Sequence, residues 1–220
     1  MDVVRAFNFI FEDQDWVGKL AIVVMLTFAT VFFPFGLIAL AALLGYAIEL
    51  AANVRAGLPA PLPRWDNIST KLANGMQVLI ALALYYVPVL VIAACSATLL
   101  RGFAVILLCC LSPIILLYSL AAGTLLAAGT VQFIETRDSR AFYRLNELVA
   151  LTSAQPAPIL TWLFFSVVAN ILISIVGLIP CIGWIIALAV TVPVQGHLLG
   201  QLVALMAQKP KRKPKRDAMY

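Results

Sequence analysis

Long apolar runs constrain this chain more than any other feature of its sequence. No charged residue occurs between Lys19 and Glu49, and none occurs between Lys71 and Arg101. A helix rises ~1.5 Å per residue, so about 20 apolar residues cross the ~30 Å hydrocarbon core of a bilayer. Hydrophobic residues make up 63% of the chain and charged residues only 11%, against about 45–50% and about 25% in soluble domains. We therefore predict an all-α polytopic membrane protein.

The apolar runs divide into about six predicted transmembrane helices. They are Val17–Phe33, Phe35–Val54, Met76–Leu99, Phe103–Phe133, Ile159–Leu178 and Trp184–Ala207. Tight Pro-Gly hairpins are expected at Phe32–Gly36 and Ile179–Gly183, because proline removes a helix hydrogen bond and glycine permits a turn. The long fourth run is expected to be one helix kinked at Pro113, with a re-entrant break there as the alternative. Residues 1–208 thus form one transmembrane domain, and residues 209–220 form a basic tail.

The distribution of cations predicts the orientation. In the six-helix arrangement every Lys and Arg except Arg101 falls on one side of the membrane. The positive-inside rule then makes both termini cytoplasmic. The outer connections are too short for an extracellular binding domain, so any recognition surface made of loops should face the cytoplasm. Met1–Trp16 lacks the cationic start of a signal peptide, and the first apolar segment is expected to remain in the mature protein.

A stiff polar segment, PLPRWDN at Pro61–Asn67, separates the second and third predicted helices; we call it the elbow. Prolines at positions 59, 61 and 63 favour an extended polyproline-like path. Trp65 is of the type that anchors at headgroup level, and Asp66 or Asn67 could cap a short helix over Ile68–Gly75. Two interpretations stay open: the elbow sets the angle between the helices, or it is a docking surface for a partner.

Four motifs together resemble a known family. They are FEDQDW at Phe11–Trp16, the elbow, YYVP at Tyr85–Pro88, and IPCIGW before the last helix. In combination they are similar to a bacterial and archaeal family of multi-pass membrane proteins designated domain of unknown function 4013. The resemblance extends over roughly Phe11–Leu205, and RAFYRLNEL at Arg140–Leu148 fits the family's amphipathic segment. The resemblance implies an integral membrane fold and no established activity; from the predicted topology we expect the protein in the cell inner membrane.

Acidic and aromatic residues near the membrane ends form the predicted interaction surface. Acids ahead of the first helix favourably meet its dipole; the alternatives are a surface cation site, or pairing with Arg64, Lys71 or the cations of Arg137–Arg144. The cytoplasmic-face interaction residues predicted from these segments are Glu12, Asp13, Asp15, Trp16, Pro61, Pro63, Trp65, Asp66, Arg140, Phe142 and Arg144.

Two ionisable residues, Glu49 and His197, fall inside apolar runs. Charges within the bilayer are costly and often functional. In one interpretation Glu49 extends to the interface and His197 hydrogen-bonds a neighbouring helix. In the other, the two side chains pair and line a proton or ion pathway. Gly196 and Gly200, four residues apart, predict close helix packing.

The predicted tail carries six cations, which are Lys209, Lys211, Arg212, Lys213, Lys215 and Arg216. Each contributes about 1 kcal/mol near an anionic leaflet, so anionic lipid headgroups are its expected partner, with an acidic protein as the alternative. Because most of the net charge of +5 lies there, we expect no nucleic-acid binding.

The sequence shows no phosphate-binding loop, no His/Glu metal set, no nucleophile with a plausible base and no metal-like cysteine spacing. We therefore expect no enzymatic activity, no cofactor and no metal. The predicted function is that of a scaffold or accessory subunit in a membrane-protein complex or homo-oligomer. The alternative is a small transporter that uses Glu49 and His197.

Overall fold

The structure, a computed structural model, describes residues 1–32, 34–99, 104–180 and 182–207. All regular elements in these ranges are helical, which confirms the all-α prediction. The α-helices are α1 (Val3–Asn8), α2 (Trp16–Ala29), α3 (Phe35–Arg55), α4 (Ile68–Leu99), α5 (Ala104–Thr136), α6 (Leu145–Ala154), α7 (Pro156–Gly177) and α8 (Gly183–Ala207). Two 3-10 helices, η1 (Phe9–Glu12) and η2 (Ser139–Tyr143), complete the set.

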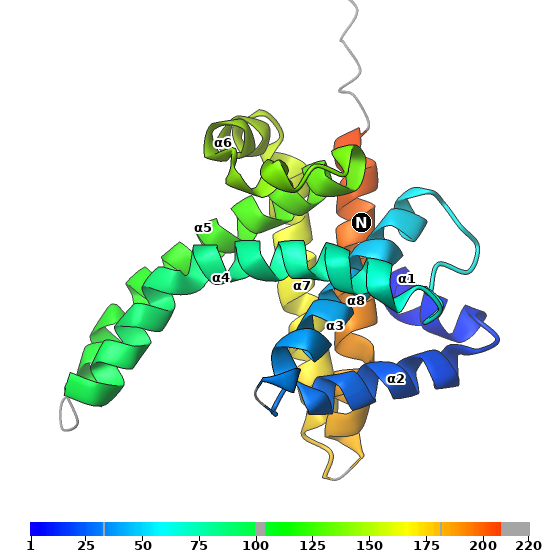
Figure 1. The fold of residues 1–220 in the computed structure, drawn as a ribbon, viewed down its shortest axis with the longest axis horizontal. Coiled ribbons are helices and arrows are strands. Elements are labelled where there is room, and N and C mark those ends of the chain that lie inside the picture. The colour runs from blue at the N-terminus through cyan, green and yellow to red at the C-terminus, as the bar shows by residue number, and fades with distance from the viewer. Residues whose placement is uncertain (33, 100–103, 181, 208–220) are drawn as a thin grey trace, which may run out of the picture.

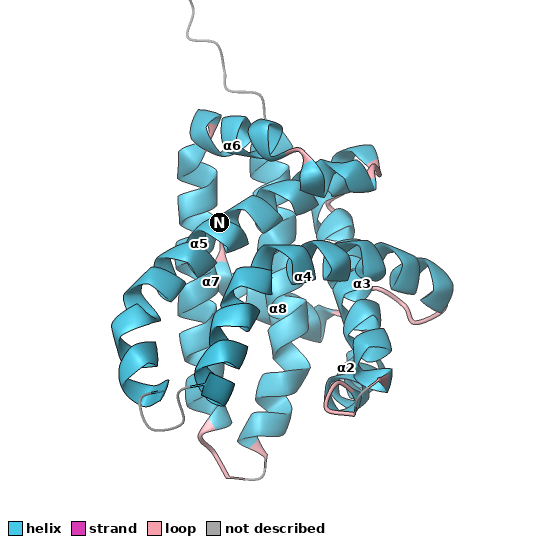
Figure 2. Ribbon diagram, turned by 60° about the vertical axis from the view of Figure 1, so that its left-hand side comes forward, coloured by secondary structure: helices cyan, strands magenta, loops and turns pink. Residues whose placement is uncertain are grey.

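Within the described residues, five helices are long and apolar enough to cross a membrane, so the chain is a polytopic membrane protein. They are α3, residues Ile68–Cys95 of α4, residues Cys110–Thr136 of α5, α7 and α8. The first predicted span is the exception in length, because α2 has 14 residues and a helix of that size measures about 21 Å. It runs across the α7–α8 pair rather than along it (Figures 1 and 2).

Helix α2 ends at Ala29, four residues before the predicted end. That predicted end, Phe33, lies outside the described residues. The reason is the turn that must follow it. The Thr30 hydroxyl donates to the Thr27 carbonyl at 2.6 Å, and a Cβ on Gly36 would collide with the Thr30 carbonyl. At the second hairpin a Cβ on Gly183 would likewise collide with the Val176 carbonyl. At both predicted Pro-Gly hairpins the described residues form a turn between two helices, while Phe33 and Cys181 within them lie outside the described residues.

Helix α3 is the centre of the fold, and small residues let two helices approach it. On one side a Cβ on Gly45 or Gly75 would overlap backbone atoms across the α3–α4 crossing. On another side Gly196 faces Ala47, and Gly200 faces Ala51. Since both numbers rise together, α3 and α8 run parallel, and the predicted packing glycines lie against a helix of the same chain.

Helices α4 and α5 are longer than the predicted spans. The separate short helix expected over Ile68–Gly75 is the first part of α4, because Gly75 packs against α3 instead of ending a helix. Pro88 and Pro113 both lie inside helices, so the described part of α5 is one helix without a re-entrant break. The far half of the α4–α5 hairpin projects from the other helices (Figure 1) and exposes apolar side chains such as Leu90 and Leu117.

An ion pair joins the ends of α3 and α5, and hydrogen bonds join the first residues of the chain to α8; we call this region the charged end. Arg55 at the end of α3 pairs with Glu135 near the end of α5 at 2.5 Å. The first residues of the chain bind there too, since the Asp2 amide donates to Gln201 Oε1 at 2.7 Å. Helix α6 and the end of α8 lie together at the top of both views (Figures 1 and 2). Which side of the membrane this end faces stays a prediction.

Candidate functional site at the charged end

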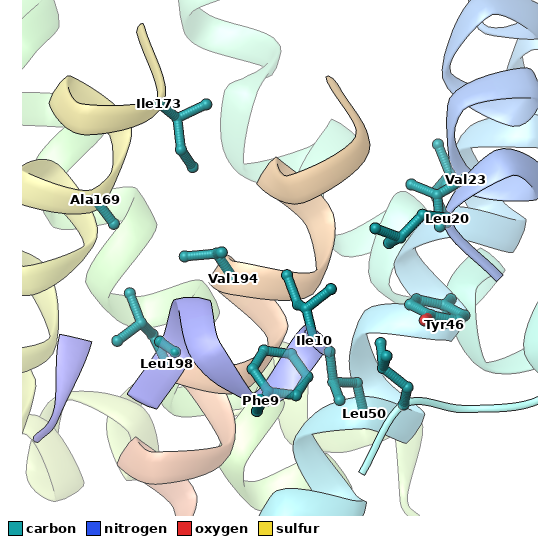
Figure 3. Close-up of a cluster of buried hydrophobic side chains, with 13 residues drawn as sticks. Phe9, Ile10, Leu20, Val23, Tyr46, Leu50, Ala169, Ile173, Val194 and Leu198 are labelled. Carbon is teal, nitrogen blue, oxygen red and sulfur yellow. The ribbon is translucent and has the colours of Figure 1, made fainter. Parts of the chain in front are cut away.

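The N-terminal segment, residues 1–15, is folded onto the helices. Gln201 Nε2 donates to the Asp2 carbonyl at 2.9 Å, which complements the bond from the Asp2 amide. Phe9 stacks on His197 with ring centroids 4.4 Å apart. Phe9 and Ile10 lie between α3 and α8, next to Leu50 (Figure 3). Burial of these apolar side chains holds the segment in one place.

One of the predicted acids, Asp13, forms a local ion pair. Lys19 Nζ lies 2.6 Å from Asp13 Oδ2, and both side chains are largely buried. The same ammonium donates to the Leu62 carbonyl at 3.1 Å, so it joins the N-terminal segment to the elbow. The Asp15 amide donates to Asp13 Oδ1 at 2.9 Å. Asp13 thus pairs with a cation in the first turn of α2, not with Arg64 or Lys71 as one alternative proposed. Glu12 and Asp15 are exposed and Trp16 is half-buried.

The elbow faces inward. Trp65 stacks on Tyr46 of α3 with centroids 4.8 Å apart and planes 11° apart, and its indole Nε1 donates to the Lys19 carbonyl at 3.1 Å. Asn53 Nδ2 donates to the Pro61 carbonyl at 2.9 Å. Pro61 and Pro63 are buried, while Asp66 is exposed. The geometry therefore favours the interpretation in which the elbow sets the angle between α3 and α4, because two of its predicted docking residues are covered by the chain itself.

The segment η2–α6 is held against α4 and α5 by a few buried side chains. Phe142 is 1% exposed and packs against Phe133 of α5, with the ring centroids 5.4 Å apart. Tyr85 of α4 donates to the Phe142 carbonyl at 2.9 Å. Arg144 lies 3.3 Å from Asp138 and 3.6 Å from Glu147, and Arg140 is exposed. Of the three predicted residues here, the phenylalanine holds the segment down and the two arginines remain accessible.

Glu49 and His197 are given different partners. Glu49 Oε2 lies 2.8 Å from Lys71 Nζ in an ion pair that lacks hydrogen-bond geometry. His197 is 4% exposed and its Nδ1 lies 3.1 Å from Gln201 Nε2 on its own helix. The hypothesis of a direct Glu49–His197 pair finds no such contact among the interactions of the described residues. The predicted hydrogen bond from His197 to a neighbouring helix is not among these interactions either; the ring stacks on Phe9 instead.

The burial of Lys71, which precedes the third predicted transmembrane helix, was not predicted from the sequence. Its side chain is 0% exposed, and Asp66 lies 4.0 Å from Nζ. The available signal was the pair of glycines at positions 45 and 75, which lets the α4 backbone touch α3 and encloses Lys71 at the crossing.

No group of three or more possible metal-ligating side chains occurs among the described residues. The six tail cations, from Lys209 to Arg216, lie outside them.

Residues 26–182 match the family described as "Protein of unknown function (DUF4013)". The chain belongs to the DUF4013 family. The matched range covers more than half of the 220 residues but is narrower than the resemblance read from the motifs. The acidic N-terminal motif and the whole of α8 lie outside it. No curated protein and no solved structure matches the chain.

Proposed function

We propose that this DUF4013 protein is a non-enzymatic scaffold or accessory subunit that binds another membrane protein at its charged end. One observation carries the proposal. Three segments distant in sequence, the N-terminal segment, the elbow and η2–α6, are each fixed to the helices by buried rings or hydrogen bonds. A surface held rigid before binding loses less conformational entropy when a partner docks.

The accessible side chains on these segments define the proposed contact surface. Glu12, Arg64, Asp66 and Arg140 are exposed, and Arg144 carries a half-exposed ion pair with Asp138. They replace Pro61 and Pro63 as the residues that a partner would touch. Charged groups of both signs favour a partner with a complementary pattern, because such complementarity steers encounter and fixes register.

We further propose that the charged end faces the cytoplasm of a bacterial or archaeal cell and that the tail binds anionic headgroups. The positive-inside rule supports this orientation. The alternative function, a transporter that uses Glu49 and His197, has less support, since the ion pair with Lys71 and the stack on Phe9 already occupy these side chains.

The test is affinity purification of the full chain in mild detergent after cross-linking in cells. We expect a defined partner with the parent protein and with the double variant Arg64→Lys/Arg140→Lys, which retains both charges. Arg64→Glu/Arg140→Glu should lose that partner, because it reverses the charge at two contact positions. Recovery of a lone monomer, whether or not residues 209–220 are present, would refute the scaffold proposal.

A further inference from the structure

A cavity of about 310 Å³ lies between the N-terminal segment, the loop that follows α3, and α8. Its walls include Arg5 and Glu12 from the N-terminal segment, and Pro59 and Pro61 from the loop. The stacked rings of Phe9 and His197 also line it, and both are buried. The cavity is large enough for a small polar ligand or a lipid headgroup, and none of the contacts described above fills it.

Several polar groups of the cavity are already used by the fold. The Asp2 carboxylate accepts from the Arg5 amide at 3.0 Å, and Gln201 exchanges two hydrogen bonds with the Asp2 backbone. His197 Nδ1 faces Gln201 Nε2 at 3.1 Å. These residues shape the cavity, and they leave few polar atoms for a ligand.

Two side chains of opposite charge remain. The Arg5 guanidinium and the Glu12 carboxylate both line the cavity and are exposed. Within the described ranges neither forms an ion pair. Because the two groups do not neutralise each other, the cavity presents one cation and one anion to a ligand.

The loop wall adds acceptors but no donors. The amides of Gly57 and Leu58 already donate to the carbonyls of Val54 and Asn53 at 3.0 and 3.2 Å, and Pro59 and Pro61 have no N–H. This wall therefore suits the ammonium group of a ligand better than a phosphate group. The cavity also lies toward the ends of α3 and α8, two of the candidate membrane-spanning helices.

We propose that this cavity binds a phosphoethanolamine group, with the phosphate on Arg5 and the ammonium on Glu12. The guanidinium donates to phosphate oxygens, a pairing that its planar shape favours. The ammonium donates to the Glu12 carboxylate and to a free loop carbonyl. The same chemistry occurs in the headgroup of phosphatidylethanolamine and in soluble phosphoethanolamine. The proposal does not depend on the partner-binding function proposed above.

The test uses the purified full chain, stripped of lipid and incubated with an equimolar mixture of phosphatidylethanolamine, phosphatidylcholine and phosphatidylglycerol with identical acyl chains. Native mass spectrometry then counts the retained lipid. We expect phosphatidylethanolamine to be retained about tenfold over the others, since each charge-assisted hydrogen bond lost corresponds to roughly a tenfold change or more. Phosphatidylcholine lacks ammonium hydrogens, and phosphatidylglycerol lacks the cation.

Arg5→Gln and Glu12→Gln should each reduce this retention about tenfold. The matched control is Arg64→Gln, an exposed cation at the same end that does not line the cavity, and it should leave retention unchanged. Displacement by soluble phosphoethanolamine at low concentration would identify the small molecule as the source of the ligand, whereas resistance to it would identify the lipid. Equal retention of the three lipids, or equal retention by all variants at equal thermal stability, would overturn the proposal.

Discussion

Replacing Glu49 by glutamine should destabilise the fold more than replacing its partner Lys71 by methionine. The asymmetry follows from burial. The Lys71 side chain is 0% exposed, whereas that of Glu49 is 39% exposed. Without the Glu49 carboxylate, the nearest remaining anion to Lys71 Nζ is that of Asp66 at 4.0 Å, a side chain that is 62% exposed. Without the Lys71 ammonium, Glu49 can still turn toward water at the charged end.

The general cost of breaking a buried ion pair sets the expected changes in the free energy of unfolding. Removing one member of a buried pair so that a charge is left uncompensated costs about 3–5 kcal/mol. The lower limit applies here because Glu49 is 39% exposed, so we expect Glu49→Gln to lower the free energy of unfolding by about 3 kcal/mol. Lys71→Met removes the buried charge and keeps an apolar stem of similar length, and should lower it by about 1 kcal/mol. The double variant should resemble Lys71→Met.

The assay is reversible unfolding of the purified chain by SDS in mixed micelles, followed by tryptophan fluorescence. The parent, both single variants and the double variant form a double-mutant cycle, which isolates the interaction between the two residues. The reasoning fails if Lys71→Met is at least as destabilising as Glu49→Gln, or if the two effects simply add. Either result would mean that the ammonium is hydrated in the folded protein or that the two side chains do not interact.

Three further predictions concern helix packing, transport and the tail. Gly45→Ala should lower the free energy of unfolding by about 2 kcal/mol or more, because its Cβ would overlap the Lys71 carbonyl. Gly18→Ala, whose Cβ meets open space, should not lower it. SDS unfolding compares the two variants, and equal effects would contradict the packing. In proteoliposomes the parent, Glu49→Gln and His197→Ala should all show background ion flux; flux that either substitution abolishes would support the transporter instead. Deleting residues 209–220 should weaken attachment of nanodisc-held protein to anionic vesicles at least tenfold, since each cation contributes about 1 kcal/mol; flotation measures this, and an unchanged attachment would refute lipid binding by the tail.

The transmembrane architecture was the part of the fold most accessible to sequence reasoning. Hydropathy and the Pro-Gly signals are local, so they located the long helices and both hairpins. These local signals did not predict the residue at which α2 ends. Thr30 and Val31 continue the apolar run, but the turn toward α3 requires the chain to leave the helix before the proline.

Contacts at the charged end were harder to predict because they join segments far apart in the chain. Lys71 illustrates the difficulty. A lysine near the start of a helix is normally a solvated flanking charge, and its burial depends on the close approach of Gly45 on another helix. Asp13 shows the opposite case: its partner Lys19 lies only six residues away, whereas the ion pairs predicted for the acidic motif were with distant cations. Asp13 lies just before α2 and Lys19 lies in its first turn, so the start of the helix brings the two side chains together.

The elbow shows how a polar segment can serve an apolar fold. Its tryptophan covers Tyr46, whose ring is 0% exposed, and its carbonyls accept hydrogen bonds from Asn53 and Lys19. Each partner belongs to a different helix, α3 or α2, so the elbow holds both at a fixed distance from the start of α4. The stiffness of the prolines then acts on the α3–α4 crossing, where the glycine contacts tolerate no added atom. A flexible linker would leave that crossing angle free, and the cation of Lys71 would no longer be enclosed beside Glu49.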